Sequence, residues 1–160
     1  MQISKVVVNA SPLIILLKAG QADLLPKLFE NIVVPQAVID EITLAKSDLV
    51  SVQLKKITWY TTANVPINPL IANWNLGDGE SSVLSFALAH PEYRAIIDDT
   101  AARRCARALA IPTLGTGGTL VLAKRRSLIP SVEEKLRLLK NAGLWLSNQV
   151  IDLIKQEAGE

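Results

Sequence analysis

The chain has 160 residues, 49% of them hydrophobic and 20% charged, and a net charge of +2 at pH 7. This composition excludes a disordered chain and a collagen-like repeat, and the small net charge gives no overall sign of a nucleic-acid partner. The only cysteine, Cys105, excludes an internal disulfide bond and a cysteine-based zinc site. Because no stretch fits a membrane span or a secretion signal, we expect a cytoplasmic protein with no membrane partner.

Short apolar strands alternate with helices along the chain. In chain order we expect strands at residues 5–9, 32–34, 57–60, 95–97 and 111–114, and helices at residues 13–18, 23–29, 35–45, 71–74, from about 77, 100–110 and 115–126, with two more that begin at Ser131 and Ser147. Pro35 is read as the first residue of its helix, and Ser131 with Glu134 as a capping box. The stretch 47–75 has the least regular pattern.

Strand–helix alternation with short connections predicts an α/β fold, with a mostly parallel central sheet covered by helices on both faces. No linker or internal repeat divides the sequence, so we expect residues 1–160 to form a single domain. In such sheets, sites form at the carboxyl ends of the strands. Three of these ends carry polar side chains: Asn9 with Ser11, Asp98 with Asp99, and the loop at 113–119.

Two acidic residues border the apolar faces of their predicted helices. Glu41 shares a face with Val38, and Glu80 lies one turn before Val83 and Leu84. Each acid has a simpler explanation as well. Glu41 can extend into solvent from the edge of its apolar face, and Glu80 can interact with the helix dipole. Their alignment with apolar faces favours a role in a cleft.

Asp98 and Asp99 follow a buried strand, where successive side chains point to opposite sides. One of them should point into the cleft and the other should cap the next helix; the sequence leaves open which does which. Carboxylates gathered in one cleft repel by roughly 4 kcal/mol for a pair about 4 Å apart, which favours a bound cation. Oxygen ligands suit Mg²⁺ or Mn²⁺.

Basic residues are concentrated in the second part of the chain. Residues 1–100 contain seven Lys and Arg against ten Asp and Glu, whereas residues 101–160 contain ten against five. The excess forms either solvated helix faces or a rim that binds phosphates beside the acids. Arg103 and Lys124 are the candidates in such a rim. The glycine-rich loop from Gly115 to Thr119 is either a phosphate cradle or a tight turn that needs glycine.

The motifs Val-Val-Val-Asn9-Ala-Ser11, Val-Pro35-Gln-Ala-Val-Ile-Asp-Glu41, Gly77-Asp-Gly79-Glu80 and Ile-Ile-Asp98-Asp99, in this order, resemble the PIN domain over nearly the whole chain. The C-terminal part resembles a compact prokaryotic branch of that family. The resemblance implies a PIN-like three-layer α/β/α sandwich and an endoribonuclease that uses Mg²⁺ or Mn²⁺. Many small members are VapC-like toxins held by a small antitoxin protein, and many form homodimers.

The resemblance also assigns residues. Glu41, Glu80, Asp98 and Asp99 correspond to the catalytic and metal-binding acids of the family. Asn9 stands where members usually carry Asp; it keeps a carbonyl oxygen as a metal ligand but lacks the charge. Ser11 corresponds to the small hydroxyl residue two positions after the first acid. It is a candidate for substrate binding together with Thr116 of the glycine-rich loop and with Arg103 and Lys124 of the basic rim, which the resemblance does not assign.

Three hypotheses follow. The first is a metal-dependent RNA endonuclease, with RNA as substrate and an antitoxin as possible partner. The second is a catalytically weakened RNA- or protein-binding module on the same fold, for which Asn9 is the signal. The third is a phosphoryl-transfer enzyme of another doubly wound family, which the lack of an Asp at position 9 disfavours.

Overall fold

A computed structural model describes residues 2–44 and 48–160 of the chain. Its central sheet has the strand order β3-β2-β1-β4-β5, and every pair of neighbouring strands is parallel. The strands are β1 (Lys5–Val8), β2 (Asn31–Pro35), β3 (Thr61–Ala63), β4 (Arg94–Ile96) and β5 (Thr113–Leu114). The predicted α/β sandwich is confirmed, with a sheet that is wholly rather than mostly parallel.

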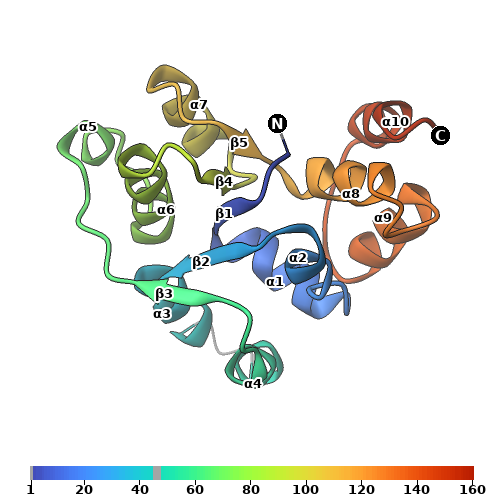
Figure 1. Ribbon diagram of the computed structural model, residues 1–160, viewed down its shortest axis with the longest axis horizontal. Helices are drawn as coiled ribbons and strands as arrows, with labels where there is room; N and C mark the ends of the chain where they lie inside the picture. The colour runs from blue at the N-terminus through green and yellow to red at the C-terminus, as the bar shows by residue number, and fades with distance from the viewer. Residues whose placement is uncertain (1, 45–47) are drawn as a thin grey trace.

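Helices cover both faces of this sheet (Figure 1). They are α1 (Ala10–Lys18), α2 (Leu24–Leu28), α3 (Gln36–Leu44), α4 (Asp48–Lys56), α5 (Pro69–Ala72), α6 (Asp78–Ala89), α7 (Thr100–Ala108), α8 (Thr116–Arg125), α9 (Val132–Asn141) and α10 (Asn148–Glu157). Helix α6 packs across β1, β2 and β4 on one face, while α1, α2 and α8 lie on the other. Within the described residues, no helix is long and apolar enough to cross a membrane.

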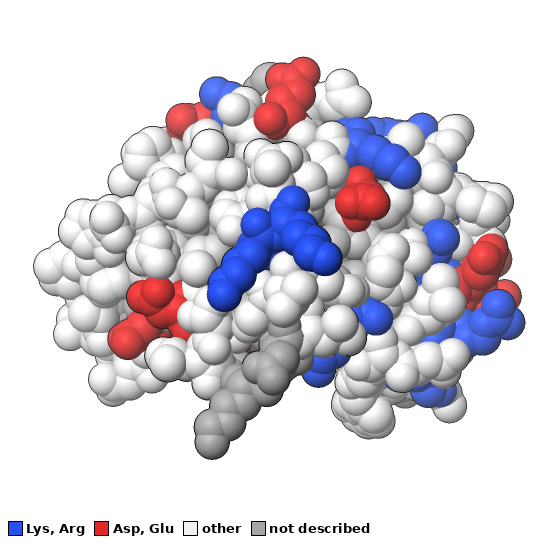
Figure 2. All heavy atoms as spheres, turned by 90° about the horizontal axis from the view of Figure 1, so that it is seen from below, with Lys and Arg blue, Asp and Glu red and all other residues white. Residues whose placement is uncertain are grey.

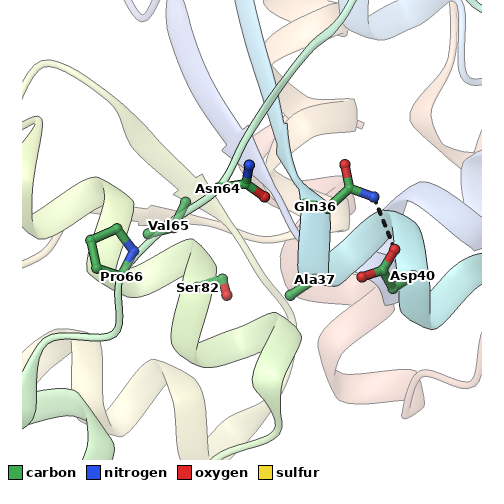
Figure 3. A pocket seen from close by; sticks show the side chains of 7 residues that line it. All are labelled: Gln36, Ala37, Asp40, Asn64, Val65, Pro66 and Ser82. Atoms are coloured by element: carbon green, nitrogen blue, oxygen red, sulfur yellow. Dashed lines mark hydrogen bonds between the residues drawn. The ribbon is translucent and has the colours of Figure 1, made fainter.

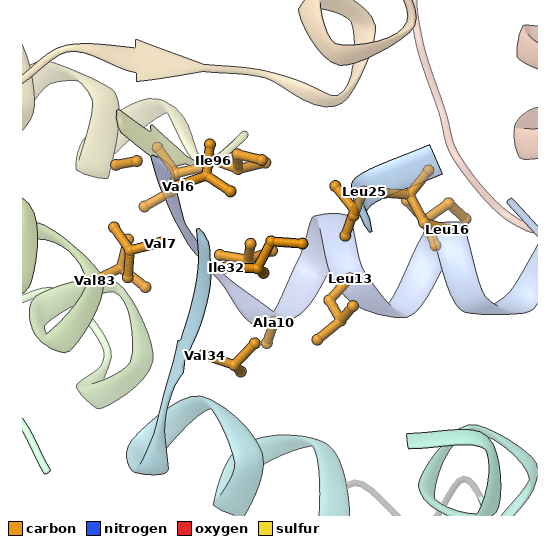
Figure 4. Packing of buried hydrophobic residues seen from close by; sticks show 14 of the residues in the cluster. Val6, Val7, Ala10, Leu13, Leu16, Leu25, Ile32, Val34, Val83 and Ile96 are labelled. Atoms are coloured by element: carbon orange, nitrogen blue, oxygen red, sulfur yellow. The ribbon is translucent and has the colours of Figure 1, made fainter. Parts of the chain in front are cut away.

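The core forms around the central strand β1, because a parallel strand between two helical layers is buried on both faces. Val6, Val7 and Val8 are fully buried. Val83 of α6 packs on one side of the sheet and Leu13 of α1 on the other (Figure 4). Burying one such side chain contributes roughly 1.5–3 kcal/mol, so this doubly covered strand holds the adjoining strand ends rigidly in place.

Residues 47–75 hold the main errors of the sequence-based assignment. The strand predicted at 57–60 is wrong, since β3 lies at Thr61–Ala63, and a helix that was not predicted, α4, precedes it. Strand β3 lies at the edge of the sheet and is largely exposed, so it lacks the apolar run that identifies a buried strand. The short helix predicted at 71–74 begins two residues earlier, at Pro69, after Asn68 as its N-cap.

The predicted helix boundaries are close to the observed ones. Pro35 ends β2 instead of opening α3, and the predicted end of that helix, at residue 45, falls outside the described residues. The hydroxyl groups of Ser131 and Ser147 accept hydrogen bonds from the backbone N–H groups of Glu134 and Val150, as expected for N-caps. Local hydrogen bonding was therefore readable from the sequence.

Candidate functional site

The site lies where the sheet reverses its winding direction. Strands β1 and β4 are neighbours, but the chain leaves β1 toward β2 on one side and β4 toward β5 on the other. Such a switch point opens a crevice at the carboxyl ends of the two strands. Asn9 follows β1 directly, and its N–H donates to the carbonyl oxygen of Ile96 at the end of β4. Asp98 lies two residues after that strand.

Asn9 is a buried polar residue with an unused acceptor. Its side chain is 1% exposed, and its Oδ1 atom accepts no hydrogen bond from any residue that the structure describes. It occupies the N-cap position of α1 without a side-chain capping bond. An unsatisfied buried acceptor costs about 1–3 kcal/mol, so its presence calls for an explanation such as a bound ion or water.

Glu41 and Gly79 complete the surroundings of this oxygen. Helices α3 and α6 pack together and bring Gly79, in the first turn of α6, against the ends of both side chains. A Cβ atom on Gly79 would lie 3.1 Å from Oε2 of Glu41 and 3.4 Å from Oδ1 of Asn9. The two oxygens therefore face one small space that a glycine leaves open.

Negative charge is concentrated around Glu41. Partial burial of this carboxyl raises its pKa above the ordinary value of 4.5, and the nearby charges of Glu80 and Asp78 raise it further. Glu80 folds back over the start of α6, with Oε2 2.5 Å from where a Cβ on Gly77 would lie. Such a group of acids favours a cation over an empty crevice, because a cation offsets their repulsion.

The acids border an open groove of about 630 Å³, which we call the acidic groove. Its lining residues are Ala37, Asp40, Glu41, Leu44, Asp78 and Gly79. The groove lies between α3 and the first turn of α6, so the predicted cleft position of Glu41 corresponds to a real depression in the surface.

Asp98 and Asp99 have different roles, as the alternation of side chains predicted. Asp99 is the N-cap of α7, where its Oδ2 accepts from the N–H of Ala102 at 2.9 Å. Asp98 turns toward β5 and accepts from both the N–H and the hydroxyl of Thr116. Nη1 of Arg103 lies on the same side, 2.9 Å from where a Cβ on Gly115 would sit, and Oδ1 of Asp98 lies 3.1 Å from that position.

The four predicted acids have different partners in the structure. In the described residues, no three Asp, Glu, His or Cys side chains come close enough to hold one metal ion. The sequence analysis predicted that the four acids surround a single ion, because it assigned them all to one crevice. In the structure, Asp99 caps a helix and Asp98 accepts hydrogen bonds from Thr116. The carboxylate of Glu41 and the carbonyl oxygen of Asn9 are donors that could hold a hard divalent ion, and such an ion would take its remaining ligands from water.

Comparison with known protein families assigns the chain to one of them. The DUF3368 family model, described as a PIN domain, matches residues 5–160. The chain is a PIN domain. PIN domains are a nuclease fold that generally binds RNA and uses divalent metal ions. Neither the curated proteins nor the solved structures give a match to the chain.

The residues predicted to bind substrate are not all at the crevice of this PIN domain. Thr116 and Arg103 lie there, on the side of Asp98. Ser11 is exposed in the first turn of α1. Lys124 lies in the last turn of α8, where its ammonium group donates to the carbonyl of Pro130 and pairs with Glu160 at 3.0 Å. Its contact with RNA stays a prediction.

Basic side chains of the PIN domain are distributed rather than concentrated on the face seen from below, where Lys and Arg occur singly or in small groups among Asp and Glu (Figure 2). Another basic residue from the second part of the chain, Arg126, serves the fold. Arg126 donates to the carbonyl oxygens of Leu28 and Ile3. This use of Arg126 supports neither a phosphate rim nor a purely solvated helix face at that position.

Sequence reasoning did not predict that Gly79 lies against Asn9 and Glu41 in the PIN domain. Its signal was its place between two acids, Asp78 and Glu80, at the start of a helix, where glycine lowers helix stability. The spacing of four residues places Gln36 and Asp40 on one side of their helix, as the sequence predicts, and the structure joins them by a hydrogen bond.

Proposed function

We propose that this PIN domain is an endoribonuclease that depends on Mg²⁺ or Mn²⁺. The observation that carries the proposal is the buried Oδ1 of Asn9, which has no hydrogen-bond partner in the described part of the chain and lies beside the Glu41 carboxylate at the open space of Gly79. Mg²⁺ usually takes only one or two protein carboxylates and keeps several waters, so this donor set suffices for a loosely held ion.

In the proposed site, Glu41 and Asn9 hold the ion, and Glu80 adds negative charge to the same side of the crevice. The ion supplies an activated water and offsets charge that develops on the phosphate. Asp98 is held in one orientation by Thr116, so it is placed to accept a hydrogen bond from a water or ribose hydroxyl. Arg103 provides a cation for a neighbouring phosphate. Asp99 keeps α7, and with it Arg103, in position.

The proposal is tested with a fluorescently labelled RNA and purified protein in Mn²⁺ or Mg²⁺. We expect cleavage by the wild type, loss of at least about a hundredfold in rate for Glu41→Gln, and full activity for Asp152→Asn, a matched change at an exposed acid of α10. A chelator should stop the reaction. Cleavage that survives Glu41→Gln unchanged would show that the assigned site is wrong.

A second candidate function is RNA or protein binding without catalysis. Two observations favour it: Asn9 lacks the charge of the usual Asp, and no group of three acids is found in the described residues. Under this alternative the wild type binds RNA in a chelator and does not cleave it with either ion. Asn9→Asp is then expected to tighten metal binding in titration calorimetry and to produce cleavage.

The resemblance to VapC-like toxins extends the proposal to a homodimer, to a small antitoxin partner and to a cytoplasmic location. Exposed large apolar side chains, such as Leu49 of α4 and Leu70 of α5, are available for such contacts. Light scattering of the purified chain measures the oligomeric state, with twice the mass of one chain expected. Co-expression with a candidate antitoxin should suppress RNA cleavage; unchanged cleavage in a stable complex would refute the toxin assignment.

A further inference from the structure

A second cavity adjoins the acidic groove. It lies between α3, the start of α6 and the chain that leaves β3, and we call it the amide pocket (Figure 3). Its volume is about 450 Å³, within the usual range for small-ligand sites. The lining residues are Gln36, Ala37, Asp40, Asn64, Val65, Pro66 and Ser82. Two of them, Ala37 and Asp40, also line the acidic groove, so one ligand can occupy both cavities.

The polarity of the amide pocket is set by one hydrogen bond. Nε2 of Gln36 donates to Oδ1 of Asp40 at 2.9 Å. An ionised carboxylate only accepts hydrogen bonds, so the NH₂ group of Gln36 must face Asp40. The carbonyl oxygen of Gln36 is therefore turned away from Asp40 and free to accept. Asp40 itself keeps further acceptor positions.

The other polar groups of the pocket can adapt to a ligand. The amide of Asn64 and the hydroxyl of Ser82 can each donate or accept. None of the seven described lining residues is Lys, Arg or His. A phosphate would thus meet a carboxylate and no cation in this pocket. The lining instead suits a flat, uncharged group that offers two N–H donors and one acceptor.

We infer that the amide pocket binds adenine or cytosine in an RNA strand whose neighbouring phosphate lies in the acidic groove. On the Watson–Crick edge of these two bases the exocyclic amino group adjoins a ring nitrogen that accepts, whereas in guanine the corresponding ring nitrogen is a donor. This inference rests on the proposed function. The amino group donates to the acceptors of Gln36 and Asp40, and the adjacent ring nitrogen accepts from Asn64 or Ser82. Uracil has carbonyl oxygens on both sides of its N–H group and would direct lone pairs at Asp40.

The test uses two labelled RNA hexamers that differ by one amino group. Both are oligouridine with one central substitution, adenosine in the first and purine riboside, which lacks the amino group, in the second. Binding is measured by fluorescence anisotropy in Ca²⁺, a hard divalent ion that can lie between the carboxylates and the RNA phosphate, and a gel of the same samples checks that the hexamers stay intact. We expect the wild type to bind the adenosine hexamer at least about fivefold more tightly, because a good contact to a base edge contributes roughly 1–3 kcal/mol.

Two variants assign this preference to the pocket. Asp40→Asn keeps the shape but no longer forces the Gln36 amide into one orientation, and Gln36→Leu removes the acceptor. Both variants should reduce the ratio of the affinities for the adenosine and purine riboside hexamers toward one. Gln149→Leu, the same change on exposed α10, is the control and should retain it. Circular dichroism checks the fold of each variant, and either of the two suffices if the other fails to fold.

Every other outcome overturns the inference. If the wild type binds the two hexamers equally, or binds neither, the pocket does not recognise the amino group of a base. A preference that persists in both pocket variants places the selectivity elsewhere. The outcome is separate from that of the nuclease proposal: a wild type that shows the preference without ever cleaving RNA refutes the nuclease alone, and one that cleaves without the preference refutes the pocket alone.

Discussion

Gly79→Ala separates metal binding from folding at the proposed centre. The added methyl group would lie 3.1 Å from Oε2 of Glu41 and 3.4 Å from Oδ1 of Asn9. The second distance is an ordinary contact, and the first requires the flexible Glu41 carboxylate to withdraw by a few tenths of an ångström. Because alanine is favoured over glycine in helices by up to about 1 kcal/mol, the variant should be as stable as the wild type without metal, or slightly more stable.

The effect on metal binding follows from the same geometry. At an ion concentration of about one hundred times Kd, binding stabilises the folded state by about 2.7 kcal/mol, which corresponds to a rise in Tm of about 5–10 °C for a domain of this size. A hundredfold loss of affinity leaves about 0.4 kcal/mol, or about 1–2 °C. We expect Mn²⁺ to raise the Tm of the wild type by the larger amount and that of Gly79→Ala by the smaller.

The assay is thermal unfolding followed by circular dichroism, with Mn²⁺ and with a chelator. Gly118→Ala is a matched control, because it adds a methyl group in the first turns of α8 where it meets only the flexible Leu114 side chain. The control should keep the full metal response. If Gly79→Ala also keeps it, the space beside Asn9 and Glu41 is not the metal site, and the reasoning fails.

Three further predictions concern charges. Without metal, Glu41→Gln should raise the free energy of unfolding at pH 7, because the raised pKa of Glu41 means that the folded state disfavours its charged form. Since the residue is exposed, the gain should be no more than about 1 kcal/mol. A loss of stability in this variant would contradict the prediction. Hydrogen bonds from the N–H groups of Val132 and Glu133, with Lys124, lower the pKa of Glu160 from 4.5 to about 2. The contribution of Glu160 to stability is therefore complete above pH 4.5 and disappears as the pH falls toward 2. Over this range the Tm of the wild type should fall more than that of Glu160→Gln, and parallel curves would exclude the contact. Arg103→Gln should weaken RNA binding and reduce the slope of log K against log salt concentration by about one. An unchanged slope would show that Arg103 does not contact an RNA phosphate.

Local patterns in the sequence determined much of the fold. The valine run of β1 and the apolar run of β2 identified buried parallel strands, because burial on both faces demands apolar residues at every position. Ser131 and Ser147 marked helix starts, since a cap bonds to an N–H group only three residues away. The alternation of side chains in a strand predicted that Asp98 and Asp99 have different roles. It did not predict which of the two caps the next helix.

Only the tertiary structure decided which polar groups meet. Gly79 reaches Asn9 and Glu41 because the sheet order places α6 over β1 and beside α3, a relation between residues far apart in the chain that no periodicity encodes. The same packing leaves Oδ1 of Asn9 without a hydrogen-bond partner among the described residues, while Asp98 accepts hydrogen bonds from Thr116. The sequence could name the candidate ligands, but contacts across the strand ends depend on strand order, and that order is set by the burial of whole helices and strands rather than by any single motif.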